Sequence, residues 1–183
     1  MNIVDIIKNY ANYGNGADAV CIDLGLPSGT LWAKCNVGAK SVTDFGNYYK
    51  CSDLGVTDVV FEEKWKLPTL DQCIELMCHT TNKWVNNYKN SGINGWLFIS
   101  PNNGNELFFP ATGLIECNEI SGHDVRRLTQ INDCGYMMIT EYHEYYNRNE
   151  PWHVHFSKHF GLSYSNTAST SKNAMPIRGV ISR

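Results

Sequence analysis

Hydrophobic residues recur along most of the chain in short runs, separated by glycine, proline and asparagine. This pattern is typical of short β-strands joined by turns. The expected strands are Ala19–Leu24, Leu31–Val37, Trp96–Ser100, Leu107–Leu114, Gly135–Thr140, Trp152–Ser157 and Ile177–Ser182. Asn102-Asn103-Gly104-Asn105 predicts a hairpin turn, because Asn and Gly tolerate the positive φ angles of tight strand connections. Leu97–Ser100 should therefore pair antiparallel with Leu107–Phe109.

One segment instead shows the periodicity of an α-helix. After Pro68-Thr69 the apolar residues share one helical face, and they are Leu70, Cys73, Ile74, Leu76 and Met77. A main helix is therefore expected over about residues 69–79, with Thr69 as its N-cap. Ser163–Asn173 is rich in Ser, Thr and Asn without apolar periodicity, so we expect a loop there. Short strands around one main helix predict an α+β fold.

The first residues form a separate short pattern. Ile3, Ile6, Ile7 and Tyr10 recur at helical spacing, and the break at Gly14-Asn15-Gly16 ends the pattern. Because an isolated short helix is marginal in water, this segment is expected either to pack on its own domain or to act as an anchor or oligomerisation segment. We accordingly divide the chain into residues 1–16, an N-terminal helix and hinge, and residues 17–183, a single domain.

The amino-acid composition and charge exclude several classes of binding partner. The formal net charge is -3 and the 15 Lys and Arg residues are scattered, so neither nucleic acid nor an anionic membrane surface is expected as a partner. No run of 18 apolar residues exists, and Met1–Tyr13 carries Asp5 and Lys8, so we expect neither membrane insertion nor a signal peptide. The seven cysteines contain no C-x-x-C pair and are interpreted as mostly reduced, apolar residues. Tyr, Trp, Asn, Ser and Gly are abundant, which is typical of recognition surfaces.

Several sequence blocks together carry a family resemblance. They are Asp23–Ala39, Gly46–Tyr49, Trp65–Thr69, Phe109–Gly113, Gly135-Tyr136, Trp152–Phe156 and Pro176–Val180. The chain resembles the Fibrobacter succinogenes major paralogous domain (FISUMP domain) of gut Bacteroidetes and their phages, over roughly residues 20–183.

The resemblance implies a C-type-lectin-like fold of the formylglycine-generating-enzyme branch. In that α+β fold, short antiparallel strands and long polar loops would surround the main helix at about residues 69–79. Domains of this kind mostly display a ligand-binding face. In relatives that retroelements diversify, the C-terminal region carries the ligand-contacting positions.

The candidate ligand-binding residues lie in that C-terminal region. Tyr supplies a large contact area with few rotatable bonds, and Asn and Arg make directional hydrogen bonds. The candidates are Tyr142, His143, Tyr145, Tyr146, Asn147, Arg148, Asn149, Tyr164 and Asn166. The alternative is a polar loop whose tyrosines pack on the domain or on a sister subunit.

The sequence motifs give little indication of catalysis or metal binding. No Gly-x-Ser-x-Gly elbow, P-loop or Cys-His signature is present, so we expect no enzyme and no catalytic residue. His153 and His155 alternate with Trp152, Val154 and Phe156, so the histidines should share one strand face and the apolar residues the other, where we expect them to lie in the core. A third metal ligand, His159 or His143, has no fixed position, and we therefore expect surface histidines, no metal and no cofactor.

These observations predict a non-catalytic binding and display module. The resemblance suggests a phage structural protein, a head or tail fibre or decoration protein at the virion surface that recognises a host-surface glycan or protein. Residues 1–13 would contact other virion proteins, and the fibre setting implies a homotrimer. The alternative is a bacterial cell-surface or structural scaffold domain without ligand recognition.

Overall fold

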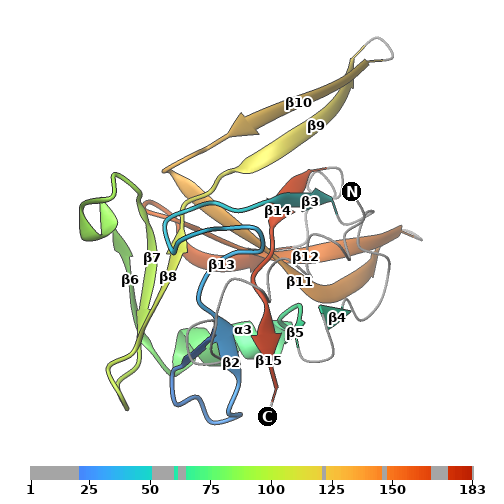
Figure 1. The fold of residues 1–183 in the computed structure, drawn as a ribbon. Helices are drawn as coiled ribbons and strands as arrows, with labels where there is room; N and C mark the ends of the chain where they lie inside the picture. Colours follow the sequence, from blue (N-terminus) through green and yellow to red (C-terminus); the bar gives the residue numbers. More distant parts are fainter. Residues whose placement is uncertain are drawn as a thin grey trace.

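Four antiparallel sheets make up most of the part of the chain that the structure describes. The computed structural model describes residues 21–50, 60–61, 65–120, 123–145, 148–165 and 173–182. A five-stranded sheet has the order β1 (Cys21–Asp23), β2 (Leu31–Ala33), β15 (Val180–Ile181), β5 (Trp65–Lys66), β4 (Val60–Phe61). A four-stranded sheet has the order β10 (His123–Thr129), β9 (Leu114–Ile120), β14 (Ala174–Pro176), β3 (Tyr48–Lys50). Figure 1 shows β9 and β10 extending away from the body of the molecule.

The other two sheets are built from consecutive strands. One consists of β6 (Thr81–Val85), β7 (Gly95–Ile99) and β8 (Glu106–Pro110), and a short 3-10 turn, η3 (Tyr88–Asn90), lies between β6 and β7. The other consists of β11 (Cys134–Tyr145), β12 (Arg148–Ser157) and β13 (Gly161–Ser165). Both are meanders in which each strand pairs with the next, so local turns largely set their registers.

The main helix and its N-cap are confirmed. Helix α3 spans Leu70–Cys78 and buries Cys73 and Leu76. The Thr69 hydroxyl oxygen accepts a hydrogen bond from the Gln72 backbone N–H at 3.1 Å, and the Gln72 side-chain oxygen accepts one from the Thr69 N–H at 3.0 Å. This reciprocal pair is a capping box, which satisfies backbone donors that a helix start otherwise leaves without partners.

The asparagine-rich hairpin is also confirmed. β7 and β8 pair antiparallel, with Leu97 opposite Phe108 and Phe98 opposite Leu107. In the turn, Asn102 donates to the Gly25 carbonyl at 3.0 Å, and Asn103 and Asn105 donate to the Asp23 carbonyl at 3.0 and 2.7 Å. The amides therefore fix the hairpin to the end of β1.

The hydrophobic core lies between the helix and the two meander sheets. Trp32, Phe98, Phe109 and Phe156 are buried there, and Phe109 contacts the other three rings. Gly135 lies opposite Phe156 in the β11–β12 register, and any Cβ at this position would clash with the Phe156 ring. A glycine is required here because the aromatic ring lies directly on the strand backbone.

The expectation of an α+β, C-type-lectin-like domain is wrong. The described residues form mostly β structure, and α3 is the α-helix among them, with nine residues. Segments that the polar pattern left unassigned form strands, among them β6, most of β9, β10 and β13. Strand formation depends on cross-strand partners and burial more than on intrinsic preference, and the polar periodicity did not reveal those partners.

Several predicted strands have different bounds. Leu31–Val37 is a strand only to Ala33, and Leu107–Leu114 divides into the end of β8 at Pro110 and the start of β9 at Leu114. Ile177–Ser182 contains only the two residues of β15, while Gly161–Ser165 is a strand that overlaps the predicted loop. The predicted N-terminal helix, with Ile3, Ile6, Ile7 and Tyr10, lies outside the described residues.

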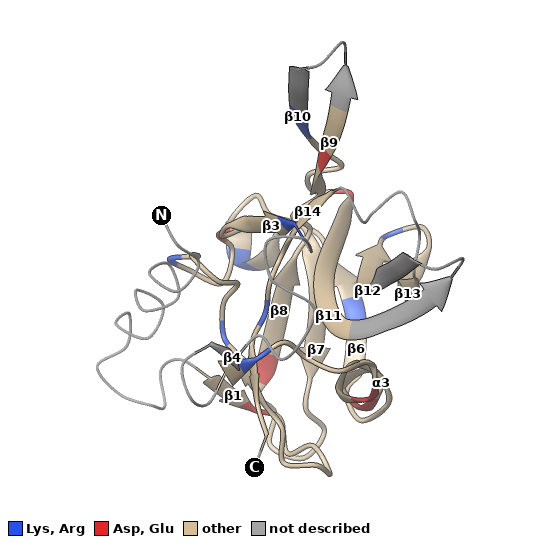
Figure 2. Cartoon of the chain, turned by 90° about the vertical axis from the view of Figure 1, so that its right-hand side faces the viewer, with Lys and Arg blue, Asp and Glu red and all other residues tan. Residues whose placement is uncertain are grey.

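Two further observations concern the distribution of charged residues and the hydropathy of the helices. Lys, Arg, Asp and Glu are dispersed over many elements of the described chain (Figure 2). Within the described residues, no helix has the length and hydropathy needed to cross a membrane.

Candidate functional site

The tyrosine-rich segment forms the distal end of a β-hairpin, not a loop. β11 and β12 are in register from Cys134 opposite Ser157, shift between Met138 and Tyr142, and continue to Tyr145 opposite Arg148. β13 pairs only with the proximal half of β12, from His153 to Ser157. The distal half is therefore a two-stranded ribbon within the described chain (Figure 1).

The structure places most of the predicted ligand-binding residues on this hairpin. Tyr142 lies opposite Pro151, His143 opposite Glu150, and Asn149 opposite Glu144. Tyr145 and Arg148 form the last described pair. Tyr146, Asn147 and Asn166 lie outside the described residues.

Tyr164 and Trp152 form a partly exposed pair of aromatic rings, which we call the aromatic surface. Tyr164 on β13 lies opposite Val154, and Trp152 is two residues from Val154 on the same face of β12. The ring centroids of Trp152 and Tyr164 are 5.9 Å apart, with the planes inclined by 40°. Tyr164 is 44% exposed, while Trp152 is half-buried against the core. The sequence assigned Trp152 wholly to the core, but the core ends beneath it.

The opposite face of the same sheet carries a cluster of three rings, the histidine cluster, in which His153 is buried and Tyr136 and His155 are partly buried. The His153 and His155 ring centroids are 5.6 Å apart, and the Tyr136 ring lies 5.8 Å from His153 and 6.2 Å from His155. The Tyr136 hydroxyl hydrogen-bonds the Gln130 side chain. His153 is only 3% exposed. The prediction that these histidines lie at the surface is therefore wrong for His153.

Burial on this face has a specific cause. β14 packs against β11, and Gly113, just before β9, forms a bridge with Gly135. The four-stranded sheet thus lies against β11, the strand that pairs with the histidine-bearing β12. Which face of a strand is buried depends on the neighbouring sheet, so periodicity could assign the two histidines to one face but not decide its burial.

The cluster is electrically neutral near neutral pH. Desolvation, helped by the neighbouring His155, lowers the pKa of His153 to about 4. Desolvation also lowers the pKa of His155 and raises the pKa of Tyr136 to about 12. The Nδ1 atoms of both histidines are buried and have no hydrogen-bond partner among the described residues. In the part of the chain that the structure describes, no three His, Cys, Asp or Glu side chains come together as a metal site.

A second buried polar centre joins three of the sequence blocks that carry the resemblance. Arg178 is 1% exposed, and its Nε donates to Asn36 Oδ1 at 2.9 Å. Its other nitrogens donate to the carbonyls of Ala33, Lys34 and Phe108 at 3.0, 2.6 and 3.2 Å. The Phe109 ring lies 4.7 Å beneath the guanidinium. These blocks therefore build the interior, whereas the aromatic surface lies elsewhere.

Sequence reasoning missed this centre. Arg178 stands in an apolar C-terminal run, and its position there was the available signal. Its acceptors are mostly backbone carbonyls, which carry no residue signature.

Comparisons of this chain with family models, curated proteins and solved structures found no match. The functional argument consequently rests on the residues and their geometry.

Proposed function

We propose that this chain is a non-catalytic binding and display module whose ligand contacts the aromatic surface and the adjacent β11–β12 hairpin. The observation that carries the proposal is the Trp152–Tyr164 pair, with centroids 5.9 Å apart and Tyr164 44% exposed. An exposed aromatic ring held by a second ring is a rigid platform, because both rings lose little conformational freedom on binding.

A glycan is the ligand class that suits this surface. Sugar rings present apolar C–H faces that stack on aromatic rings, and hydroxyls that bind polar neighbours. Polar residues at the neighbouring register positions include His143, Arg148 and Asn149. The scattered charge of the chain, with a formal net charge of -3, disfavours a polyanion as the ligand.

The setting that we propose is the surface of a phage particle. The support is the resemblance of the sequence blocks to domains of gut Bacteroidetes and their phages. An antibody raised against the chain should decorate intact virions. Labelling of the bacterial envelope instead would support the alternative of a cell-surface domain.

Substitution of Tyr164 tests ligand binding. The full chain is titrated against a panel of purified surface polysaccharides from gut Bacteroidetes, by calorimetry and by tryptophan fluorescence. For any polysaccharide that binds, Tyr164→Ala should weaken binding by roughly tenfold, the typical effect of losing an aromatic contact at the centre of an interface.

The matched control is Phe160→Ala. Phe160 is 85% exposed and lies in the β12–β13 turn, at the other end of the same sheet. This variant should bind like the wild type. Equal losses in both variants would contradict the aromatic surface as the site, and an absence of binding across the panel would favour a scaffold without ligand recognition.

A further inference from the structure

The arm formed by β9 and β10 has little of its own protein to pack against. Beyond Ile115 opposite Leu128, its strands comprise Glu116–Ile120 and His123–Arg127. β14 reaches the arm only at its base, where Ala174 pairs with Ile115. Arg126, Arg127 and Leu128 are exposed, and Leu128 is 41% exposed. A two-stranded ribbon without a packed face is marginally stable in water, so a partner would stabilise this one.

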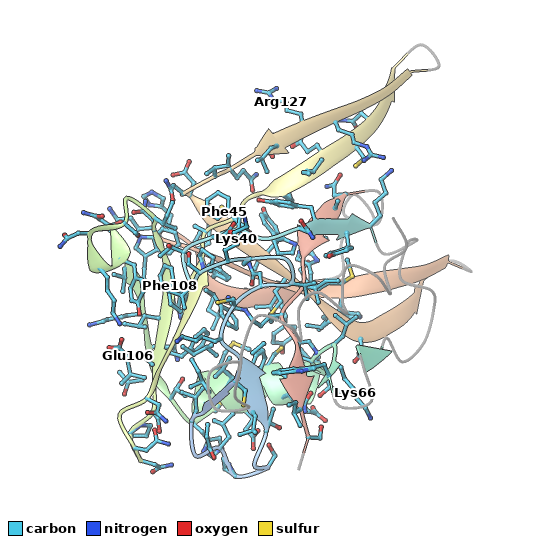
Figure 3. The ribbon with its side chains drawn as sticks, in the orientation of Figure 1. Lys40, Phe45, Lys66, Glu106, Phe108 and Arg127 are labelled. Carbon is cyan, nitrogen blue, oxygen red and sulfur yellow. The ribbon has the colours of Figure 1, made fainter. Side chains whose placement is uncertain are left out.

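The two edges of the arm differ. On the β9 side, the Cys117 backbone N–H donates to the Asn173 side chain at 3.3 Å, which occupies part of that edge. On the other side, β10 is the last strand of its sheet within the described residues. Because every second residue of an antiparallel strand turns its backbone N–H and C=O away from its partner strand, the seven-residue β10 presents the backbone donors and acceptors of its alternate residues at the outer edge, which is a template for pairing with another strand. Figure 3 shows the Arg127 side chain on this arm pointing away from the body.

The charge order along β10 is self-complementary in one register. Antiparallel pairing of two copies about a two-fold axis through Val125 places Asp124 of each copy opposite position 126 of the other, an arginine. Registers centred on Asp124, Arg126 or Arg127 would instead place like charges opposite each other. Opposite charges across strands stabilise a pairing, and like charges destabilise it.

We propose that β10 is a homodimerisation edge, at which two copies of this chain pair antiparallel with Val125 at the two-fold axis. The sheet β10-β9-β14-β3 then continues across the interface into the same sheet of the second copy. The pairing is closed, because a two-fold axis uses the same patch on both copies. It therefore predicts a dimer, not the trimer that a phage fibre implies.

Charge reversal tests the register. Light scattering of the full chain is measured at protein concentrations up to roughly 1 mM, at which even a weak dimer forms. It should give twice the mass of the 20.7 kDa chain. Arg126→Asp creates two acidic pairs and Asp124→Arg two basic pairs, so each variant alone should dimerise roughly 10- to 100-fold more weakly. An equimolar mixture of the two should form heterodimers, because every pair is again of opposite charge.

The control is Lys83→Asp, the same change of charge at an exposed position on β6, another edge strand. It should dimerise like the wild type. A monomeric or trimeric wild type, or a mixture of the variants that fails to associate, would overturn the proposal. The mixture also detects misfolding, since variants with a collapsed arm could not rescue each other.

A cysteine at the axis gives an independent measurement. Two Val125→Cys chains would place their Cα atoms about 4.5 to 5.5 Å apart, within the range that a disulfide spans. Arg127→Cys shares the same face of β10 but would lie about 13 Å from its copy. Under mild oxidation Val125→Cys should form a covalent dimer, and Arg127→Cys should remain at the background that the seven native cysteines give. Equal cross-linking of both variants would contradict the register.

Discussion

At the scale of single residues, the histidine cluster makes the stability of the fold depend on pH. A neutral His153 lies at 3% exposure among aromatic rings, and within the part of the chain that the structure describes its Nδ1 has no hydrogen-bond partner. Burial of such a group is tolerated as long as the imidazole stays uncharged. Acid is therefore expected to weaken the fold at this position first.

The pH dependence of folding follows from the lowered pKa of His153. The folded-state pKa is about 4 and the ordinary value is 6.5, so the unfolded chain binds more protons between these values. Stability is thus fully present above pH 6.5 and falls as the pH falls toward 4, by about 3 kcal/mol in total. Urea titrations at a series of pH values measure this loss.

Substitution of His153 tests whether this residue causes the pH dependence of stability. His153→Phe keeps an aromatic ring in the cluster and should flatten the dependence of the unfolding free energy on pH between about 4 and 6.5. His159→Gln, at an exposed position in the β12–β13 turn, should leave the curve unchanged. An unaltered slope in the His153→Phe variant would show that other groups cause the acid sensitivity.

At the scale of elements, helix α3 depends on its capping box. Thr69→Ala removes the hydroxyl that accepts from the Gln72 N–H, and it should lower the free energy of unfolding by about 1 kcal/mol. Thr69→Ser keeps an accepting hydroxyl and should lie close to the wild type. Equal stabilities for the alanine and serine variants, measured by urea unfolding, would contradict the role of the cap.

Gln72 adds a tertiary contact to this local motif. Its side-chain nitrogen donates to the hydroxyls of Thr30 and Ser182 at 3.3 and 3.2 Å. The helix start is thereby joined to the residue before β2 and to the residue after β15. The sequence indicated Thr69 as the cap because capping is local, but it did not indicate these distant hydroxyls.

At the scale of the whole molecule, Arg178 connects segments that are far apart in sequence. Asn36 and Phe108, two of its acceptors, are 142 and 70 residues away. Arg178→Met should leave three carbonyls and one amide oxygen without their donor, at a cost of roughly 3 to 5 kcal/mol. That is a large part of the total stability of a typical domain.

Two further variants separate the effect of charge from that of geometry. Arg178→Lys retains the positive charge but not the planar set of donors, so it should also be strongly destabilised. Lys83→Met, at an exposed position on β6, should change stability by less than about 0.5 kcal/mol. If urea unfolding found Arg178→Lys as stable as the wild type, charge alone would satisfy the site.

The sequence by itself determined the features that depend on neighbouring residues. The α3 helix with its Thr69 cap and the asparagine turn between β7 and β8 follow from capping chemistry, helical periodicity and turn preferences. The alternation in Trp152–Phe156 likewise assigned Val154 and Phe156 to the core, and both are buried. It also placed Tyr164 among the candidate ligand contacts, where the structure gives it an exposed ring beside Trp152.

Only the tertiary structure decided how these elements combine. It showed that polar segments such as β10 and β13 are strands, that His153 is buried, and that Arg178 is satisfied by distant carbonyls. Cross-strand pairing and burial link residues at any separation along the chain, and backbone carbonyls carry no side-chain signature. The fold class and the buried polar centres were therefore fixed by contacts that no local pattern encodes.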